Sequence, residues 1–325
     1  MDALSEILRS ARLSGGVFLR GQFSEPWRLS SALEAGDCSR HLGPADHLVL
    51  YHCVTEGALT VEIDGEAPQV FRPGQVAILP RNDPHRLSGS DGAEAVSALD
   101  VARIPKPGDL MEIIYGGGGA ATQIVCGFLG GPSLSDDPLL SSLPKLLTFD
   151  CAKARSGALV RASLEFAADE VSVGRPGAEA MLARLSELLF IEAVRSYVEA
   201  LPDTAGGWLA ALKDKALSRA LAALHANPER QWTVDRLGRE AGMSRSALAD
   251  KFARLIGCAP AAYLTQHRMR LAARELLVTQ APLVSIAEAV GYGSEAAFSR
   301  AFKRTFGVSP SAWRRDQGQH SEAQS

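Results

Sequence analysis

Cysteine is scarce in this chain: its 325 residues include only five, and these follow no metal-binding or disulfide pattern. No two of them form a CxxC pair, and an odd number in a reducing compartment indicates free thiols. The chain also lacks an apolar run long enough to span a bilayer. Its first residues, MDALSEILRSARLSGG, lack the apolar core of a secretion signal. These absences exclude a disulfide-rich secreted protein and a membrane protein, and they predict a globular protein of the cytoplasm.

Positive charge is concentrated in the last third of the chain, although the net charge of the whole chain is only −3. Residues 208–316 contain 17 Lys and Arg against 9 Asp and Glu, a net of +8, whereas all other residues together carry 17 against 28, a net of −11. Clustered cations gain affinity for nucleic acid by releasing phosphate counterions. We therefore expect double-stranded DNA to bind the last third.

Two helix-turn-helix patterns lie in this basic segment, at 233–256 and 284–307. In each pattern a glycine permits a sharp turn and a serine can cap the second helix. Apolar residues recur on one side of each second helix, which leaves the other side available to a DNA groove. The predicted helix caps and turn glycines are Thr233, Gly242, Ser244, Gly291 and Ser294.

The outward side chains of the second helices are of types that read DNA. Arg can hydrogen-bond guanine through two donors, Glu can accept from cytosine, Ser can bond base edges or phosphate, and Lys neutralises phosphate. Between the patterns, residues 260–278 predict one long helix that could place both reading helices in successive major-groove turns. The predicted DNA-binding residues are Arg245, Ser246, Ala249, Asp250, Arg254, Ser294, Glu295, Ala296, Ser299, Arg300, Lys303 and Arg304.

The first part of the chain has the pattern of a small all-β domain. From about Val17 to Phe128, short apolar stretches such as GVFLRG and QVFRPGQVAILP alternate with Gly, Pro, Asn and Asp. This spacing predicts short antiparallel strands in a small barrel or sandwich. The glycine-rich stretch 106–122 interrupts the pattern and predicts a hairpin excursion.

From Pro138 the pattern becomes helical, and residues 177–201 carry a stripe of leucines and valines at helical spacing. The stripe either meets a second copy in a homodimer or packs against the chain's own barrel. The next residues, LPDTAGGW, contain proline, aspartate and paired glycines, which predict a hinge.

The segment GYGSEAAFSRAFKRTFGVSPSAWR resembles the DNA-binding domain of AraC/XylS-type transcriptional regulators nearly throughout, and the similarity extends back to about Ala220. The resemblance implies seven helices, with two helix-turn-helix units joined by a long helix. It also implies binding to promoter DNA, usually with activation of transcription through RNA polymerase.

The stretches YHCVTEG and RPGQVAILPRNDPHRLS resemble the two motifs of the cupin-type sensor domain in one subgroup of that family, which contains a regulator that senses reactive chlorine through cysteine oxidation. Cupin enzymes hold a metal with about three His and a carboxylate. The candidates here are His52, Glu56 and His85, but Val54 occupies one ligand position of the first motif. The incomplete set favours an effector pocket without a metal cofactor over bound iron or zinc.

Four cysteines are candidates for an oxidative switch: Cys126, Cys53, Cys38 and Cys151. A redox sensor needs thiolate character and access to solvent. Cys126 lies in an apolar strand, where an inert buried thiol is common, whereas the other three have charged or imidazole neighbours in the sequence. The residues leave a small molecule and an oxidant open as the signal.

Together these patterns predict an α+β protein, with an N-terminal cupin-like antiparallel β-barrel plus helices followed by an all-α domain. The expected parts are a cupin-like sensor domain at 1–135, a helical dimerisation region at 136–201, a linker at 202–210, a DNA-binding domain at 211–316 and a disordered tail at 317–325. The predicted function is a homodimeric, non-enzymatic, sequence-specific transcriptional regulator that responds to a small molecule or an oxidant. Two alternatives remain: a metal-dependent cupin enzyme fused to a DNA-binding domain, and a constitutive DNA-binding protein.

Overall fold

The structure is a computed structural model that describes residues 3–11, 13–34, 45–89, 93–103, 111–131, 137–173, 177–202 and 204–315. The chain divides into two compact units, Ala11–Leu201 and Met1–Ser10 with Pro202–Ser325. The division at Leu201 lies where the linker was predicted to begin. The first ten residues, however, group with the C-terminal unit rather than with the predicted cupin-like domain. The predicted tail at 317–325 lies outside the described residues.

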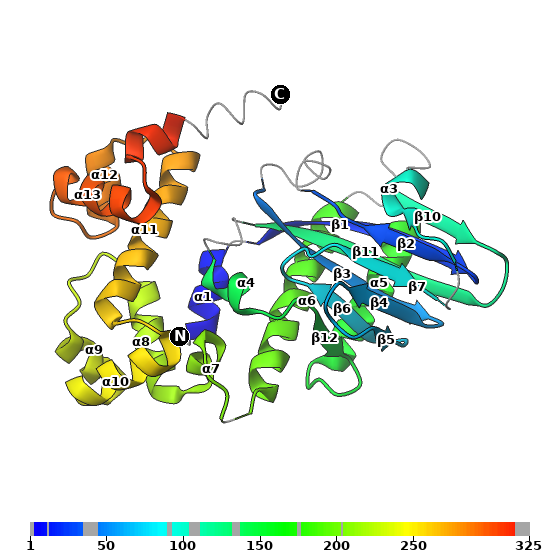
Figure 1. Ribbon diagram of the computed structural model, residues 1–325, viewed down its shortest axis with the longest axis horizontal. Helices are drawn as coiled ribbons and strands as arrows, with labels where there is room; N and C mark the ends of the chain where they lie inside the picture. Colours follow the sequence, from blue (N-terminus) through cyan, green and yellow to red (C-terminus); the bar gives the residue numbers. More distant parts are fainter. Residues whose placement is uncertain are drawn as a thin grey trace. The chain divides into compact units, whose positions relative to one another are not determined.

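The unit Ala11–Leu201 is built around two sheets (Figure 1). Its strands are β1 (Ser14–Ser24), β2 (Arg28–Ser31), β3 (His47–Glu56), β4 (Leu59–Ile63), β5 (Gln69–Phe71), β6 (Gln75–Leu79), β7 (His85–Ser88), β8 (Val96–Ser97), β9 (Ala102–Arg103), β10 (Met111–Gly116), β11 (Ala121–Gly131) and β12 (Leu147–Asp150). One sheet has the order β12-β6-β3-β11-β1-β10-β9, and the other has the order β5-β4-β7-β2-β8.

Both sheets are mixed, which corrects the prediction of purely antiparallel strands. β1 pairs with β10 in parallel, and β2 pairs with β8 in parallel. Strand β10 lies inside the stretch 106–122 that was predicted to be a hairpin excursion. The glycines that suggested a hairpin instead end β10 and form the turn that follows it. Gly116, the last residue of β10, has φ +140°, and a β-carbon there would lie 1.9 Å from the carbonyl oxygen of Ser24.

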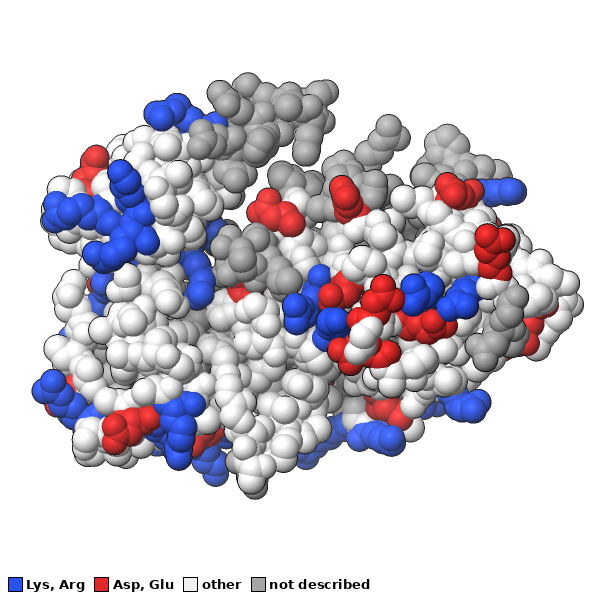
Figure 2. All heavy atoms as spheres, viewed as in Figure 1, with Lys and Arg blue, Asp and Glu red and all other residues white. Residues whose placement is uncertain are grey.

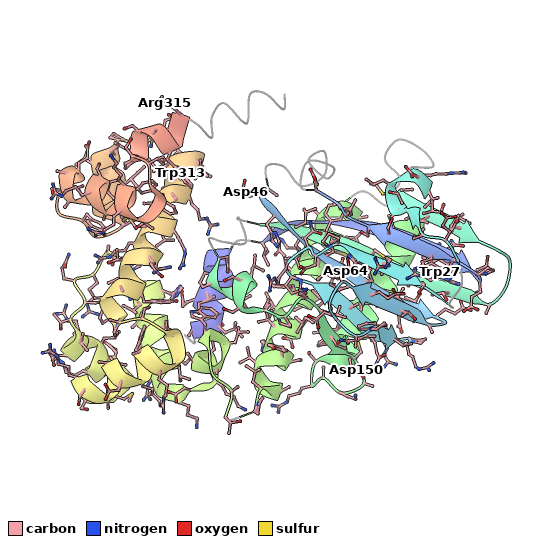
Figure 3. The ribbon with its side chains drawn as sticks, viewed as in Figure 1. Trp27, Asp46, Asp64, Asp150, Trp313 and Arg315 are labelled. Atoms are coloured by element: carbon pink, nitrogen blue, oxygen red, sulfur yellow. The ribbon has the colours of Figure 1, made fainter. Side chains whose placement is uncertain are left out.

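Apolar side chains from both sheets form one buried core, which includes Trp27, Leu48, Leu50 and Phe71. Alternate residues of β3 face this core because successive side chains of a strand point to opposite sides. Trp27, labelled in Figure 3, stacks on Phe23 with 4.1 Å between ring centroids.

Helices accompany the sheets in this unit: α3 (Ala98–Val101), α4 (Pro138–Ser142), α5 (Gly157–Val173) and α6 (Ala178–Ala200). Helix α6 packs against β1 and β12, and β12 itself continues the larger sheet. The region 136–201, predicted to be helical, therefore also contributes a strand. Leu182, Leu189 and Val194 of the α6 stripe are buried within the chain.

The other unit is helical. It contains most of α1 (Ala3–Ala11) together with α7 (Trp208–Lys213), α8 (Lys215–Ala226), α9 (Val234–Ala241), α10 (Arg245–Ile256), α11 (Pro260–Val278), α12 (Leu283–Ala289) and α13 (Glu295–Phe306). Trp208 and Leu209, predicted to lie in the linker, belong to α7 and are buried. The indole Nε1 of Trp208 donates to the hydroxyl oxygen of Tyr263 at 3.4 Å. The DNA-binding unit therefore begins earlier than predicted. Within the described residues, no helix is both long and apolar enough to span a bilayer.

Candidate DNA interface and barrel site

The two helix-turn-helix units form from local signals in the sequence. The side chains of Thr233, Ser244 and Ser294 each accept a hydrogen bond from a backbone N–H of the helix that they precede. Gly242 and Gly291, in the turns, have φ of +69° and +85°, a region that favours glycine. The predicted caps and turns are confirmed, and α9 with α10 and α12 with α13 occupy the two predicted segments.

The inward faces of α10 and α13 fix which sides of these helices remain exposed. Leu248 and Phe252 of α10 are fully buried, as are Phe298 and Phe302 of α13. Phe302 is surrounded by aromatic rings, with centroids 5.7 Å from Phe298 and 5.9 Å from Trp313, which Figure 3 labels beyond α13. Because the apolar side of each helix is committed to the core, its opposite side is presented to solvent.

The predicted DNA-binding residues lie on those opposite sides. Ten of the twelve are exposed, and Ala249 and Ser299 are half-buried at the edges of the exposed faces. Figure 2 shows Lys and Arg gathered over α12 and α13, and near α9 and α10, where acidic side chains are mixed among them. The structure therefore presents a polar face on each reading helix, largely basic on α13 and of mixed charge on α10. Base recognition with phosphate contacts needs polar and basic side chains of this kind.

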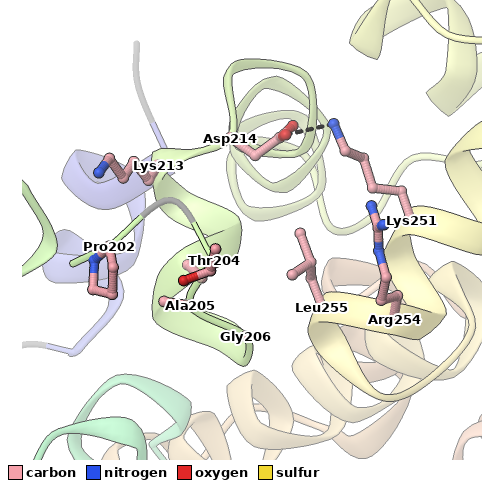
Figure 4. A pocket seen from close by; sticks show the side chains of 10 residues that line it. Pro202, Thr204, Ala205, Gly206, Lys213, Asp214, Lys251, Arg254 and Leu255 are labelled. Atoms are coloured by element: carbon pink, nitrogen blue, oxygen red, sulfur yellow. Dashed lines mark hydrogen bonds and ion pairs between the residues drawn. The ribbon is translucent and has the colours of Figure 1, made fainter.

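Two of the predicted contacts have neighbours that qualify their roles. Arg245 Nη1 lies 3.6 Å from the Asp235 carboxylate, but both side chains are mostly exposed, so this ion pair contributes little to stability. Arg254 lies about two turns after Arg245 on α10. It lines a cavity of about 630 Å³ (Figure 4). The same cavity is lined by Leu255 and by the ion pair of Asp214 and Lys251. Base contacts come from the N-terminal residues of a reading helix. The position of Arg254 suits a phosphate contact better than a base contact.

In the unit Ala11–Leu201, which we call the barrel unit, a chain of three buried side chains crosses the core. The Nδ1 of His52 lies 2.9 Å from the Sγ of Cys126, and its Nε2 lies 3.0 Å from the Nε2 of His85. The Nδ1 of His85 lies 3.0 Å from the carbonyl oxygen of Asp83. His52 and Cys126 face each other because they are a cross-strand pair of β3 and β11.

If every group is neutral, only one arrangement of protons satisfies all of these contacts. A carbonyl oxygen cannot donate, so the Nδ1 of His85 carries the proton that points at Asp83. The Nε2 of His85 must then accept from the Nε2–H of His52, which leaves the Nδ1 of His52 to accept from the thiol of Cys126. All three groups are neutral in this arrangement. Burial, and for His52 also the neighbouring His85, lowers the pKa of both histidines, that of His85 to about 4.

Glu56, the third predicted member of the barrel site, lies elsewhere. It is exposed, and its carboxylate accepts a hydrogen bond of 2.6 Å from the side chain of Gln123. The pairing of β3 with β11 shifts register at this end, since Val54 pairs with Ile124 and Glu56 with Gln123. Thr55 is the extra residue of a bulge, and a bulge breaks the alternation on which the prediction rested. Placing Glu56 with the two histidines was therefore wrong.

The described candidate thiols are buried. Burial raises the pKa of Cys53 to about 12 and that of Cys126 further, and it also raises the pKa of Cys151. A high pKa leaves little of the reactive thiolate at neutral pH. Cys38 lies outside the described residues. The cross-strand contact between His52 and Cys126 was missed because a sequence does not state which strands pair.

The neutral histidines make the barrel sensitive to acid. In the unfolded chain their pKa returns to about 6.5, so the unfolded state binds more protons below that value. The stability that these groups contribute is complete above pH 6.5 and is lost as the pH falls toward 4. We expect the unfolding midpoint of the barrel to fall over this window, as measured by calorimetry. A His85→Gln variant should show a weaker pH dependence there, whereas an equal fall in both proteins would contradict the assignment.

Comparisons with known proteins agree with both units. Residues 2–199 match the family model described as Cupin, and residues 237–316 match the model described as Helix-turn-helix domain. The HTH-type transcriptional regulator AlkR of Acinetobacter baylyi is 32% identical, covering 97% of this chain and 99% of its own. The RCS-specific HTH-type transcriptional activator RclR of Escherichia coli is 30% identical, covering 97% of each chain.

An AraC-like transcription regulator of Streptomyces lividans is 33% identical over 88% of this chain and 93% of its own. The cupin match spans more than half of the chain, and these relatives are similar over nearly their whole length. The chain therefore belongs to the AraC-type helix-turn-helix transcriptional regulators that carry an N-terminal cupin domain.

Proposed function

We propose that α10 and α13 read two half-sites on one face of a promoter duplex, and that a signal received in the barrel changes this binding. The observation that carries the proposal is the pair of exposed polar faces, each held outward by a buried apolar face on the same helix. Reading helices of this kind place their exposed face in the major groove. Half-sites about one helical turn apart suit two units joined by one rigid helix.

Strand β3 contacts the barrel core with one face and α6 with the other. Helix α6 ends at Ala200. His52 faces the core, while the preceding Tyr51 points to the opposite side, where its hydroxyl lies 2.8 Å from the Ser186 hydroxyl of α6. A ligand that displaces His52 therefore acts on the same strand that holds α6. In this mechanism α6 has two alternative packings against β3, and the ligand increases the population of the packing that it binds better.

The proposal involves no resident metal and no catalytic step. Both ring nitrogens of His52 are already engaged, with Cys126 and His85, and the nearest candidate carboxylate, Glu56, lies outside the core. Among the described residues, no three His, Cys, Asp or Glu side chains are arranged to hold a metal ion. The side chains present do not fit the cupin metal site, and the relatives are named as regulators.

A small organic molecule is favoured over an oxidant as the signal, because the pKa of each described candidate thiol is raised by burial. One relative is named an RCS-specific activator, so an oxidant is the alternative to test.

We further propose activation through RNA polymerase in the cytoplasm. We also propose a homodimer formed through α5 and α6, where Leu159 and Met181 are large apolar side chains left exposed.

Selection of bound duplexes from a random pool by the purified full-length chain tests the reading mode. We expect a selected sequence with two conserved blocks whose centres are about 10 base pairs apart. A single conserved block would contradict reading by both helices.

A reporter gene placed behind the selected sequence then tests the signal. Candidate molecules and hypochlorite are added in separate arms, with Cys126→Ser and Cys53→Ser as controls for oxidation. Identical output under every addition would favour the constitutive DNA-binding alternative.

A further inference from the structure

Arg268 lies in the middle of α11, the helix that joins the two reading units, and its guanidinium contacts the first unit through backbone carbonyls. Its Nε donates to the carbonyl oxygen of Pro228 at 2.7 Å, and its Nη2 donates to that of Arg230 at 2.9 Å. Both carbonyls belong to the loop 227–233, which leads from α8 into α9. The planar fork of an arginine suits two acceptors at once.

The same guanidinium lies against the second unit. Its Cζ is 5.8 Å from the ring centroid of Tyr292, in the turn between α12 and α13. At the neighbouring Gly291, a β-carbon would come within 2.6 Å of the Nη2 of Arg268 and 2.5 Å of the carbonyl oxygen of Glu229. Tyr292 in turn packs edge-on against Phe298 of α13, at 6.0 Å. The turn that sets the start of α13 is therefore packed tightly around Arg268.

The loop and the turn also contact each other directly. The side-chain nitrogen of Gln231 donates to the carbonyl oxygen of Gly291 at 3.3 Å. The loop is held to the first unit by Arg236 of α9, whose Nη1 donates to the carbonyl oxygen of Gln231 at 3.0 Å. We call Arg268, the loop 227–233 and the turn 291–292 the clasp.

Each helix-turn-helix unit packs on α11 through its own core. In the first helix-turn-helix unit Phe252 packs against Tyr263. In the second, Phe298 and Met269 belong to one buried cluster. The helix thus sets the distance between the units, and the clasp lies beside it and bridges them. We propose that Arg268 is a positioning residue that fixes the rotation of the two reading helices relative to each other, and so the spacing of half-sites that the protein accepts. This inference rests on the proposed reading of one duplex by both α10 and α13.

The physical effect of the clasp is to make the second contact with DNA effectively intramolecular. When one reading helix is bound, a fixed geometry holds the other at a high effective concentration over the correct half-site, and a loose geometry spreads it over many positions. Lysine keeps the charge of Arg268 but is a single ammonium, which cannot hold both carbonyls in a fixed fork while stacking on Tyr292. Arg268→Lys therefore separates positioning from general attraction to phosphate.

The test measures binding of full-length wild-type and Arg268→Lys proteins to three fluorescent duplexes by anisotropy. The first is the duplex selected by the wild-type chain, the second has two base pairs inserted between the half-sites, and the third has one half-site scrambled. We expect Arg268→Lys to bind the selected duplex about tenfold more weakly than wild type does. The two inserted base pairs should reduce the affinity of Arg268→Lys much less than they reduce the affinity of wild type. Both proteins should bind the scrambled duplex equally well. Gln266→Ala, an exposed neighbour on α11, is the matched control and should behave as wild type on all three.

Wild-type affinity and spacing dependence in Arg268→Lys would overturn the proposal, as would equal losses on the selected and scrambled duplexes. If Arg268→Lys does not fold, Gln231→Ala is the second variant, because it removes the direct hydrogen bond to Gly291 by changing an exposed side chain. In this variant, the ratio of affinities for the selected and the inserted duplex should be two- to threefold smaller than in wild type. An unchanged spacing dependence in that variant would overturn the proposal equally. If the wild-type protein itself does not distinguish the three duplexes, the proposed reading by two helices fails, whatever the variants do.

Discussion

Replacing Phe302 by alanine is expected to unfold the second reading unit. Phe302 is fully buried, and its ring contacts the rings of Phe298, Phe306 and Trp313. Truncating a buried phenylalanine costs about 3 to 5 kcal/mol, because apolar burial is lost and a cavity remains. For a unit of this size, a loss of about 4 kcal/mol lowers the unfolding midpoint by more than 10 °C. Calorimetry of the full-length chain measures this shift.

The control for this change is Phe302→Leu, which keeps most of the volume and should cost much less. Val284→Ala on α12 is a second control, because Val284 is 44% exposed and its truncation should be nearly neutral. On the selected duplex, Phe302→Ala should lose protection of one half-site in footprinting while the other stays protected. A midpoint close to that of wild type would mean that the aromatic cluster around Phe302 does not hold this unit together.

Replacing Arg300 by alanine is expected to weaken binding to the selected duplex by about 1 to 3 kcal/mol, roughly five- to 150-fold, as loss of a bidentate base contact does. Arg300 is exposed on α13, on the side opposite the buried Phe298 and Phe302. Anisotropy titrations on selected and random duplexes measure the effect. Arg245→Ala on α10 tests the first unit in the same way.

Arg304→Ala is the matched control for Arg300, because Arg304 is exposed on the same helix but lies in its last turn. Its removal should weaken binding to both duplexes by a similar factor, as loss of a phosphate contact does. If Arg300→Ala also weakened both duplexes equally, Arg300 would be a phosphate contact rather than a reader of bases.

The helical half of the protein could be predicted closely because its signals are local. A capping hydroxyl such as that of Ser244 acts on a backbone N–H three residues away, and Gly242 allows a left-handed turn wherever it stands. Helix α11 has the predicted bounds, because its sequence contains no breaker after Pro260. The exposed faces of α10 and α13 follow from the same helical spacing.

The barrel half could be predicted only as a class of fold. A strand pattern does not show the partner or the direction of the strand, so the parallel pairing of β1 with β10 was missed. A bulge inserts one extra residue into one strand of a pair and cannot be recognised from the hydropathy pattern. The bulge at Thr55 nevertheless moves Glu56 away from the predicted pocket. The boundary of the linker was misplaced because Trp208 is anchored by Tyr263, a contact across 55 residues.

By itself, the sequence determined the family, the two helix-turn-helix units and the exposed faces of their second helices, since the units and their faces depend on interactions within a few turns of the chain. Only the tertiary structure decided that His52 lies between Cys126 and His85, and that Arg268 bridges the two reading units. Contacts of this kind join residues 33 to 74 positions apart. Their partners are chosen by strand pairing and helix packing, which no local spacing encodes.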